Sequence, residues 1–297
     1  MSLPEGVSVI LAPNPSLMTG AGTNTYLVAG ADGCVVIDPG PEIESHLVAV
    51  ADAARAQGGA RALLVTHGHP DHVEGAARLR ELTGAPVVAW SREGSPSADE
   101  TLADDATFSL GNRRLRALRS PGHRYDHLCF LLEGEGTIFA GDLVAGAGTV
   151  VIAPPEGDLD DYLTSLRRLL TLEPHDLRQL APGHGPTRED SRALLEGYIA
   201  HREQRERQLI AALGDDDEAL LVPELVGRIY TDVATELWPV AAYSTLAGLL
   251  KLERQGDAHR AEGVADEPVA RVERTPLALE GVVGRPDGID ARWRRAR

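Results

Sequence analysis

The sequence is poor in cysteine, and both of its cysteines lie in apolar stretches. Only Cys34 and Cys129 occur among 297 residues, in "GCVVID" and "HLCFLL". A free cysteine in such a setting behaves as a small buried hydrophobe, so the sequence predicts two core side chains rather than a disulfide. A reducing compartment fits this usage best, and we expect a cytoplasmic protein.

The chain also lacks a hydrophobic run long enough to span a membrane, which takes about 18 consecutive apolar residues. Its first residues, "MSLPEGVSVILAPNPSL", show no basic segment followed by an apolar core. With 43% hydrophobic residues, a chain of this length can bury a full core. These features predict a soluble globular protein with one large domain, a small one and no membrane partner.

Positive charge is scarce as well. Lysine and arginine number 29 against 45 aspartates and glutamates, which gives a net charge of −16. Binding to nucleic acid through bulk electrostatics requires a basic field. The composition therefore argues against nucleic acid as a partner, unless a local basic patch provides the contact.

Short apolar runs bounded by Gly, Pro and Asp recur through the first two thirds of the chain and read as strands. Helical spacing of Leu, Val and Ala appears at about 41–58, 72–82 and 159–171. In "CFLLEGEGTIFAG" the Gly-Glu-Gly predicts the turn of a hairpin. This α+β mixture favours two β-sheets packed together and covered by helices over residues 1–186, rather than a doubly wound parallel sheet.

The pattern then becomes helical. One long helix is expected from an N-cap at Thr187 to Gly214, followed by helices at about 222–230 and 239–254 and a break at Gly256. This order is typical of a winged-helix module, so residues 187–260 are assigned to a small all-α domain. The tail, 261–297, mixes Pro, Gly and charged residues without periodicity and is expected to be disordered.

Three histidines and an aspartate lie within six positions directly after the apolar run "ALLV". They are His67, His69, Asp71 and His72, in "THGHPDH". Imidazole and carboxylate are the ligands that zinc and similar divalent metals prefer, and a tight loop at a strand end can bring several to one point. The alternative is a histidine-rich surface loop with Asp71 capping the next helix.

Three further ligand-type residues stand beside glycines at the ends of apolar runs. His123 lies in "SPGHRYDH", Asp142 in "IFAGDLV" and His184 in "LAPGHGP". Any one of them alone is more often a turn residue. Together they predict that three more strand ends deliver ligands to the same rim.

This set of motifs resembles the signature of the metallo-β-lactamase superfamily, with every ligand position of the dinuclear form filled. The resemblance covers roughly residues 1–186 and implies an αββα sandwich with two metals at one edge. It implies that His67, His69 and His123 hold the first metal, that Asp71, His72 and His184 hold the second, and that Asp142 bridges them. Zn²⁺ is the first choice of metal, with Mn²⁺ or Fe²⁺ as alternatives. Asp38, in "VVIDPG", matches an early aspartate that supports the ligand loop, although a plain turn role is equally open.

A narrower resemblance covers about residues 8–258 through "GTNTYLV", "SPGHRYDH", "DDYLTSLRRLL", "PGHGP" and "YIAHREQRERQL". These stretches are similar to the β-lactamase-like protein 2 branch, which includes glyoxalase-II-like hydrolases, polyketide-releasing thioesterases and a single-strand endoribonuclease. One departure is Arg124, where the branch usually has a small hydroxyl residue. Because this position lies beside the site, it puts the substrate preference in doubt.

The resemblance implies hydrolysis by a hydroxide that bridges two metals, with Asp71 and Asp142 in catalysis. No Gly-x-Ser-x-Gly elbow is present, so a serine nucleophile is not indicated. His127 is a candidate general acid or oxyanion donor, and a histidine bonded to backbone is the alternative. Asn24 and Tyr26 are candidates for the pocket border, with core packing favoured for Tyr26.

A small acyl compound, namely a thioester, ester or lactone, is the preferred substrate. RNA cleavage is the alternative, through a basic track drawn from Arg124, Arg167, Arg168, Arg202, Arg205, Arg207, Lys251 and Arg254, most of which are interleaved with acidic residues. A mononuclear iron dioxygenase and a non-catalytic DNA-binding regulator are the less favoured classes. The sequence does not indicate an oligomeric state.

Overall fold

The computed structural model describes residues 3–214, 219–261 and 286–296. They form two compact units. The sheet unit comprises Met1–Val150 and Asp161–Glu196, and the helical unit comprises Val151–Asp160 and Gly197–Arg297. The sequence predicts a domain boundary near residue 186. In the structure, the chain passes from one unit to the other within two helices, Leu159–Leu170 and Ser191–Leu213.

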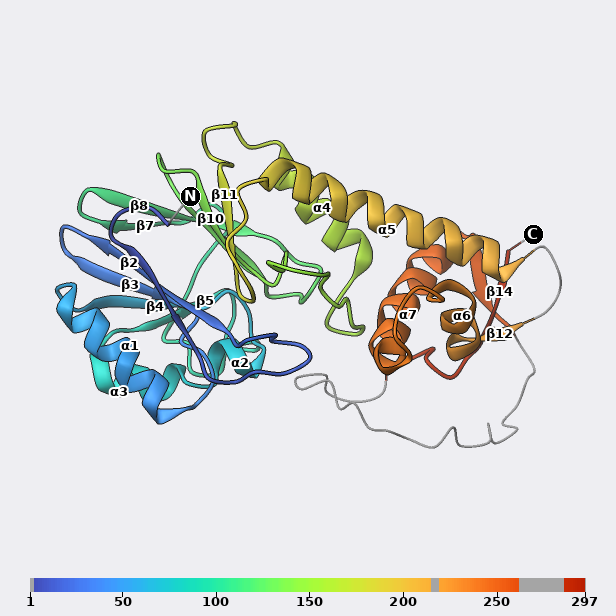
Figure 1. Ribbon diagram of the computed structural model, residues 1–297, viewed down its shortest axis with the longest axis horizontal. Helices are drawn as coiled ribbons and strands as arrows, with labels where there is room; N and C mark the ends of the chain where they lie inside the picture. Colours follow the sequence, from blue (N-terminus) through green and yellow to red (C-terminus); the bar gives the residue numbers. More distant parts are fainter. Residues whose placement is uncertain (1–2, 215–218, 262–285, 297) are drawn as a thin grey trace. The chain divides into compact units, whose positions relative to one another are not determined.

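Six strands build the first sheet of the sheet unit, in chain order from its edge. They are β1 (Val7–Leu11), β2 (Asn24–Gly30), β3 (Gly33–Ile37), β4 (Ala60–Leu64), β5 (Val87–Ala89) and β6 (Glu100–Thr101). The first three run antiparallel, and β3 to β6 run parallel. Helices α1 (Glu44–Ala56) and α3 (Ala76–Thr83) cover one face of this sheet (Figure 1). All residues of β3 are buried because both of its faces are covered.

The second sheet has five strands in the order β11-β10-β9-β8-β7. Their bounds are β7 (Thr107–Leu110), β8 (Arg113–Arg119), β9 (Leu128–Leu132), β10 (Thr137–Gly141) and β11 (Gln179–Pro182). The predicted hairpin is confirmed, since β9 and β10 pair antiparallel with Leu132 opposite Thr137. Helix α4 (Leu159–Leu170) lies against this sheet, where the Arg168 guanidinium donates to the carbonyl of Arg119 at 2.9 Å.

The main core lies between the two sheets. Alternate residues of the facing strands fill it, among them Val35, Leu64, Leu115, Phe130 and Phe139, all at most 1% exposed. This period of two is what the apolar runs predicted. Cys34 and Cys129 are both free and buried, as expected. The predicted αββα arrangement is confirmed.

One edge of this sandwich collects the strand ends that carry the polar motifs. Asp38 follows β3, His67 lies three residues after β4, Asp142 follows β10, and His184 lies two residues after β11. The short helix α2 (Pro70–Val73) continues the loop after β4. Because neighbouring strands end at one edge, residues far apart in the sequence meet there.

The helical unit contains the long helix α5 (Ser191–Leu213), then α6 (Val222–Ile229) and α7 (Trp238–Gln255) with a one-turn helix η1 (Thr235–Leu237) before it. The three predicted helices are confirmed. Helix α5 ends at Leu213, directly before Gly214 as expected, although it begins four residues after Thr187. In the described part of the chain, none of the helices is both long and apolar enough to cross a membrane.

The helical unit is not all-α. A three-stranded sheet, in the order β12-β14-β13, joins β12 (Leu220–Leu221), β13 (Ala258–Arg260) and β14 (Arg292–Arg295). The tail was expected to be disordered from residue 261, and this is wrong for residues 286–296, while 262–285 lie outside the described residues. Trp293 explains the difference, because its side chain is fully buried in the core of this unit and its indole donates to the carbonyl of Gly288 at 3.0 Å.

Trp293 anchors the last strand, so its truncation is expected to destabilise the helical unit. Trp293→Ala should lower the free energy of unfolding by about 3–5 kcal/mol, the range for removing a large buried aromatic side chain. Denaturant unfolding followed by circular dichroism measures this loss. Trp238→Ala is the matched control, because Trp238 is only partly buried against the same core and its loss should cost less. Equal stability of Trp293→Ala and the parent protein would contradict the role of Trp293 as the anchor of the last strand.

Candidate metal centre

The histidine-rich loop begins where β4 ends. The amide of Leu128 donates to the carbonyl of Thr66 at 2.7 Å, which fixes the residue before His67 against the second sheet. Pro70 starts α2, so Asp71 and His72 lie in its first turn. Gly68 is required by close packing, because a Cβ there would lie 1.9 Å from the carbonyl oxygen of Gly94.

Four ligand-type side chains form a first group: His67, His69, His123 and Asp142. Their ligand atoms all lie within 4.8 Å of one another. Nδ1 of His69 is 2.9 Å from Nε2 of His67 and 3.0 Å from Nε2 of His123. Oδ2 of Asp142 is 3.6 Å from Nε2 of His123.

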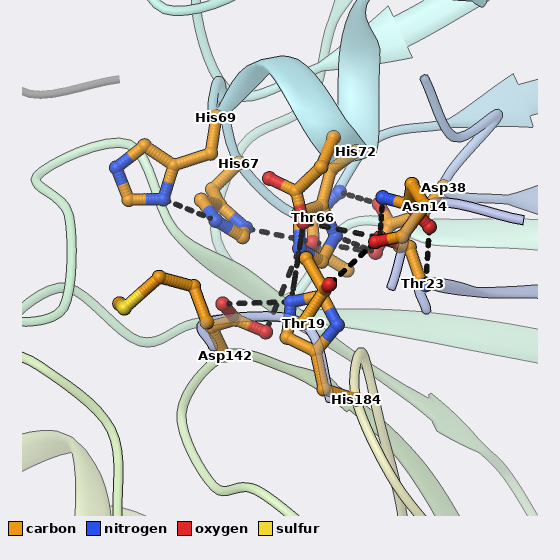
Figure 2. Close-up of polar contacts among 12 residues, drawn as sticks. Asn14, Thr19, Thr23, Asp38, Thr66, His67, His69, His72, Asp142 and His184 are labelled. Carbon is orange, nitrogen blue, oxygen red and sulfur yellow. Dashed lines mark hydrogen bonds and ion pairs between the residues drawn. The ribbon is translucent and has the colours of Figure 1, made fainter. Parts of the chain in front are cut away.

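Asp71, His72 and His184 form a second group beside the first. Oδ2 of Asp71 lies 3.4 Å from Nε2 of His72 and 3.2 Å from Nε2 of His184, and the two imidazole nitrogens are 3.4 Å apart. Asp142 also reaches this group, 3.5 Å from His72 and 3.4 Å from His184. Figure 2 shows Asp142 and His184 facing each other below the ligand loop. All seven predicted ligands thus meet at one place, with Asp142 in contact with both groups.

These separations fit divalent cations. Ligand atoms about 2.0–2.1 Å from a tetrahedral zinc ion lie about 3.3 Å from one another. The six separations given above within the two groups, 2.9 to 3.6 Å, bracket that value. Imidazole nitrogens and carboxylate oxygens are also the donors that zinc, manganese and iron accept. The residues present therefore fit two metal ions.

The electrostatics of the two groups differ. Burial lowers the pKa of His67 and of His69 well below the usual value, so both imidazoles are neutral and present free lone pairs. Burial acts on His184 in the same direction, but the carboxylates of Asp142 and Asp71 outweigh it and raise the pKa of His184 to about 10. The same carboxylates and Asp38 also raise the pKa of His72 against the effect of burial. The carboxylates of the second group thus favour positive charge there, which a metal ion would supply.

Asp38 ties the two groups together. Its Oδ1 accepts the Thr66 amide at 2.8 Å, and its Oδ2 accepts the Thr66 hydroxyl at 2.9 Å and lies 2.8 Å from Nδ1 of His72. The same hydroxyl lies 3.0 Å from Nδ1 of His67. Hydrogen bonds at Nδ1 leave Nε2 of each histidine free for a metal. Of the two roles open for Asp38, support of the ligand loop is the one that the contacts show.

His127 is fully buried, and both of its ring nitrogens are engaged. Its Nε2 accepts the backbone amide of Asp142 at 3.1 Å, and its Nδ1 lies 2.8 Å from the Ser120 hydroxyl. Burial lowers the pKa of His127 to about 3, which keeps the ring neutral. These contacts favour the backbone-bonded alternative over a general acid, because they leave no ring nitrogen directed at a substrate.

Arg124 is buried beside the first group. Its Nε donates to Oδ1 of Asp126 at 2.7 Å, and Asp126 in turn accepts the backbone amide of Gly68, between His67 and His69. The cation at this unusual position therefore braces the ligand loop through a carboxylate. The sequence placed Arg124 beside the site correctly but did not indicate its partner.

Asn24 and Tyr26, candidates for the pocket border, hold the loop that carries His184 instead. The Tyr26 hydroxyl donates to the carbonyl of Pro182 at 2.8 Å, and the Asn24 amide donates to the carbonyls of Pro182 and Gly185 at 3.0 and 2.9 Å. Tyr26 is 3% exposed and packs in the core, as favoured.

Sequence reasoning missed the hydroxyl groups around the site. Thr66, Ser120 and Thr23 each contact a ligand or a residue that holds one. Thr66 directly precedes His67, and this adjacency was the one available signal. Thr23 lies 48 positions from its partner Asp71, and Ser120 lies seven positions from its partner His127, at the other end of "SPGHRYDH".

Known proteins share both units. The chain matches the Metallo-beta-lactamase superfamily over residues 18–184 and the Beta-lactamase associated winged helix domain over residues 222–266. It is 33% identical over 275 residues to a Beta-lactamase-like protein 2 homolog of Drosophila melanogaster, covering 86% of this chain and 90% of that one. It is 32% identical over 244 residues to an atrochrysone carboxyl ACP thioesterase of Aspergillus fumigatus, covering 76% and 75%.

The fold also has counterparts among solved structures. A metallo-beta-lactamase family protein of Thermus thermophilus superposes with a TM-score of 0.75 at 22% identity, over 99% of this chain and 100% of that one. At this identity the likeness concerns the fold.

Removal of the acceptor oxygen of Asp38 is expected to weaken metal binding. The two carboxylate oxygens of Asp38 contact Thr66 and His72. In Asp38→Asn a single amide oxygen is left as acceptor, so either Thr66 or His72 loses its partner. Loss of such an outer contact typically lowers metal affinity about 10–100-fold, which competition with a chromophoric chelator measures. Asp105→Asn is the matched control, because Asp105 has nearly the same backbone angle, φ 58° against 55°. Unchanged affinity in Asp38→Asn would contradict this role.

Proposed function

The chain belongs to the metallo-β-lactamase superfamily, and on that basis we propose that it is a dinuclear-metal hydrolase of small acyl compounds, namely thioesters, esters or lactones. Its sheet unit is an enzyme of the metal-dependent hydrolase type, joined to the associated winged helix. The substrate class and the number of metals are the proposal.

One observation carries the two-metal proposal. Asp142 lies within 3.6 Å of ligand atoms in both groups, so a single carboxylate contacts both. A bridging carboxylate sets two cations a few ångströms apart, as two-metal hydrolases require. A single metal in the first group would leave Asp71, His72 and His184 clustered without a cation. A buried carboxylate without a compensating positive charge is costly.

Two bound divalent ions would supply a water of lowered pKa as nucleophile and would polarise the carbonyl oxygen of the substrate. The chain contributes the positioning. His127 holds the backbone of Asp142, while Asp38 and Thr66 orient His67 and His72. Asp71 and Asp142 would serve as carboxylate ligands of these ions. We prefer Zn²⁺, with Mn²⁺ or Fe²⁺ as alternatives, because the ligand set is rich in imidazole.

Two features support an acyl substrate. One relative of similar length bears the name of an acyl carrier protein thioesterase. In addition, most residues of the basic track required for RNA are neutralised by carboxylates. The pairs are Arg124 with Asp126, Arg168 with Asp104, Arg205 with Asp232, Lys251 with Glu206 and Arg254 with Asp158. A cation paired with a carboxylate attracts phosphates less, because the two charges offset each other.

Turnover by the metal-loaded protein tests the proposal on two substrates side by side: a short acyl thioester and a fluorogenic single-stranded RNA. We expect hydrolysis of the thioester. Asp142→Ala should lower kcat by about 100- to 1000-fold, because metal stabilisation is worth several kcal/mol in the transition state. The same variant should hold less metal.

The two substrates distinguish the alternatives. Cleavage of the RNA alone would overturn the acyl proposal and direct attention to the basic residues. Hydrolysis unchanged by Asp142→Ala would overturn the bridging site itself. One iron per chain, with no second metal, would indicate an oxygenase rather than a hydrolase.

A further inference from the structure

A short segment between β1 and β2 contacts two ligands of the second metal group. It is Gly22–Asn24, which precedes and begins β2. The Thr23 hydroxyl lies 3.1 Å from Oδ2 of Asp71, and the carbonyl of Gly22 lies 3.3 Å from Nδ1 of His184. Thr23 also forms a β-bridge with His184. Two of the three ligands of the second group are therefore held by this one segment.

The direction of the hydrogen bond to Asp71 is fixed by the covalent chemistry of its neighbours. The backbone amide of Thr23 can only donate, and it does so to Oδ1 of Asn14 at 2.9 Å. The other terminal atom of Asn14 is then the NH₂ group, which donates to the Thr23 hydroxyl oxygen at 3.0 Å. The hydroxyl proton is left for Asp71, which accepts it. Figure 2 shows Asn14 and Thr23 beside the second group.

The surroundings make this geometry rigid. Thr23 is fully buried, and its carbonyl accepts the amide of Ala12 at 2.8 Å. Asn14 is held in turn by the Thr19 hydroxyl, which donates to its carbonyl at 2.6 Å. Gly22 lies so close to Ala12 that a Cβ there would be 2.0 Å from the Ala12 carbonyl oxygen. A carboxylate that a fixed donor already orients loses less conformational freedom when it binds a cation.

The first group is braced by other parts of the chain. His67 is hydrogen-bonded to the Thr66 hydroxyl. The backbone next to His67 is hydrogen-bonded to Asp126, which Arg124 holds in turn. Asp38 and Thr66 support His72 as well as His67. Asp71 and His184, by contrast, are held by the Gly22–Asn24 segment, so the two metal affinities need not change together. We propose that Thr23, oriented by Asn14, is a positioning residue that sets the affinity of the second metal selectively. This inference rests on the two-metal centre proposed above.

A Zn²⁺ titration of the metal-free protein, with a competing chelator and metal content measured by mass spectrometry, tests the inference. Thr23→Val keeps the shape of the side chain and removes the hydroxyl. We expect the second Zn²⁺ to bind about 10- to 100-fold more weakly and the first to bind as in the parent protein. Thr23→Ser should restore the second site. Asn14→Ala should weaken it in the same direction, and it serves as a second variant if Thr23→Val does not fold.

Thr137→Val is the matched control. Thr137 is equally buried, and its hydroxyl accepts the Gln179 amide at 2.7 Å at the end of β10 away from Asp142. Metal binding in this variant should be unchanged. Equal weakening of both sites in Thr23→Val, or affinities like those of the parent protein, would overturn the selective role. If the parent protein itself binds a single Zn²⁺, the proposed two-metal function fails, and that result is distinct from a failure of Thr23.

Discussion

The metal centre depends on the carboxylate of Asp38, which is fixed in an unusual backbone conformation at the end of β3. Its φ of 55° lies in the left-handed region that side chains other than glycine, asparagine and aspartate rarely adopt. The backbone is held from both sides, because its amide donates to Leu64 and its carbonyl accepts the Thr25 hydroxyl. This placement lets one carboxylate contact Thr66 and His72 together, and through Thr66 it reaches His67. Asp38 therefore links the support of His67 in the first group to that of His72 in the second.

Much of the sandwich follows from local sequence. Runs such as "CVVID" and "LCFLL" are short, apolar and bounded by turn residues, and such segments form buried strands wherever the other sheet covers them. The seven candidate ligands were also recognisable, since histidine and aspartate next to glycine at strand ends are chemically distinctive. The resemblance to a family then assigned them to two metals. The structure brings all seven together.

The supports of the site were not predictable in the same way. Thr23 lies 48 positions from Asp71, and Ser120 holds His127 rather than a ligand. Threonine and serine are common in loops, and nothing local distinguishes a hydroxyl that contacts a carboxylate from one that faces water. The last strand was missed for a similar reason. "RWRR" contains one apolar residue among charges, and the burial of Trp293 depends on β12 and β13, which come from much earlier in the chain.

The order of the strands around β14 also bears on how the protein is made. β13 ends at Arg260 and β14 begins at Arg292, yet β14 lies between β12 and β13 in their sheet. During synthesis the chain emerges from its N-terminus, and units fold as their last strand becomes available. The sheet unit has its final strand, β11, once Pro182 has emerged. The sheet of the helical unit lacks its central strand until Arg292–Arg295 has emerged, so the sheet unit can pair all of its strands first.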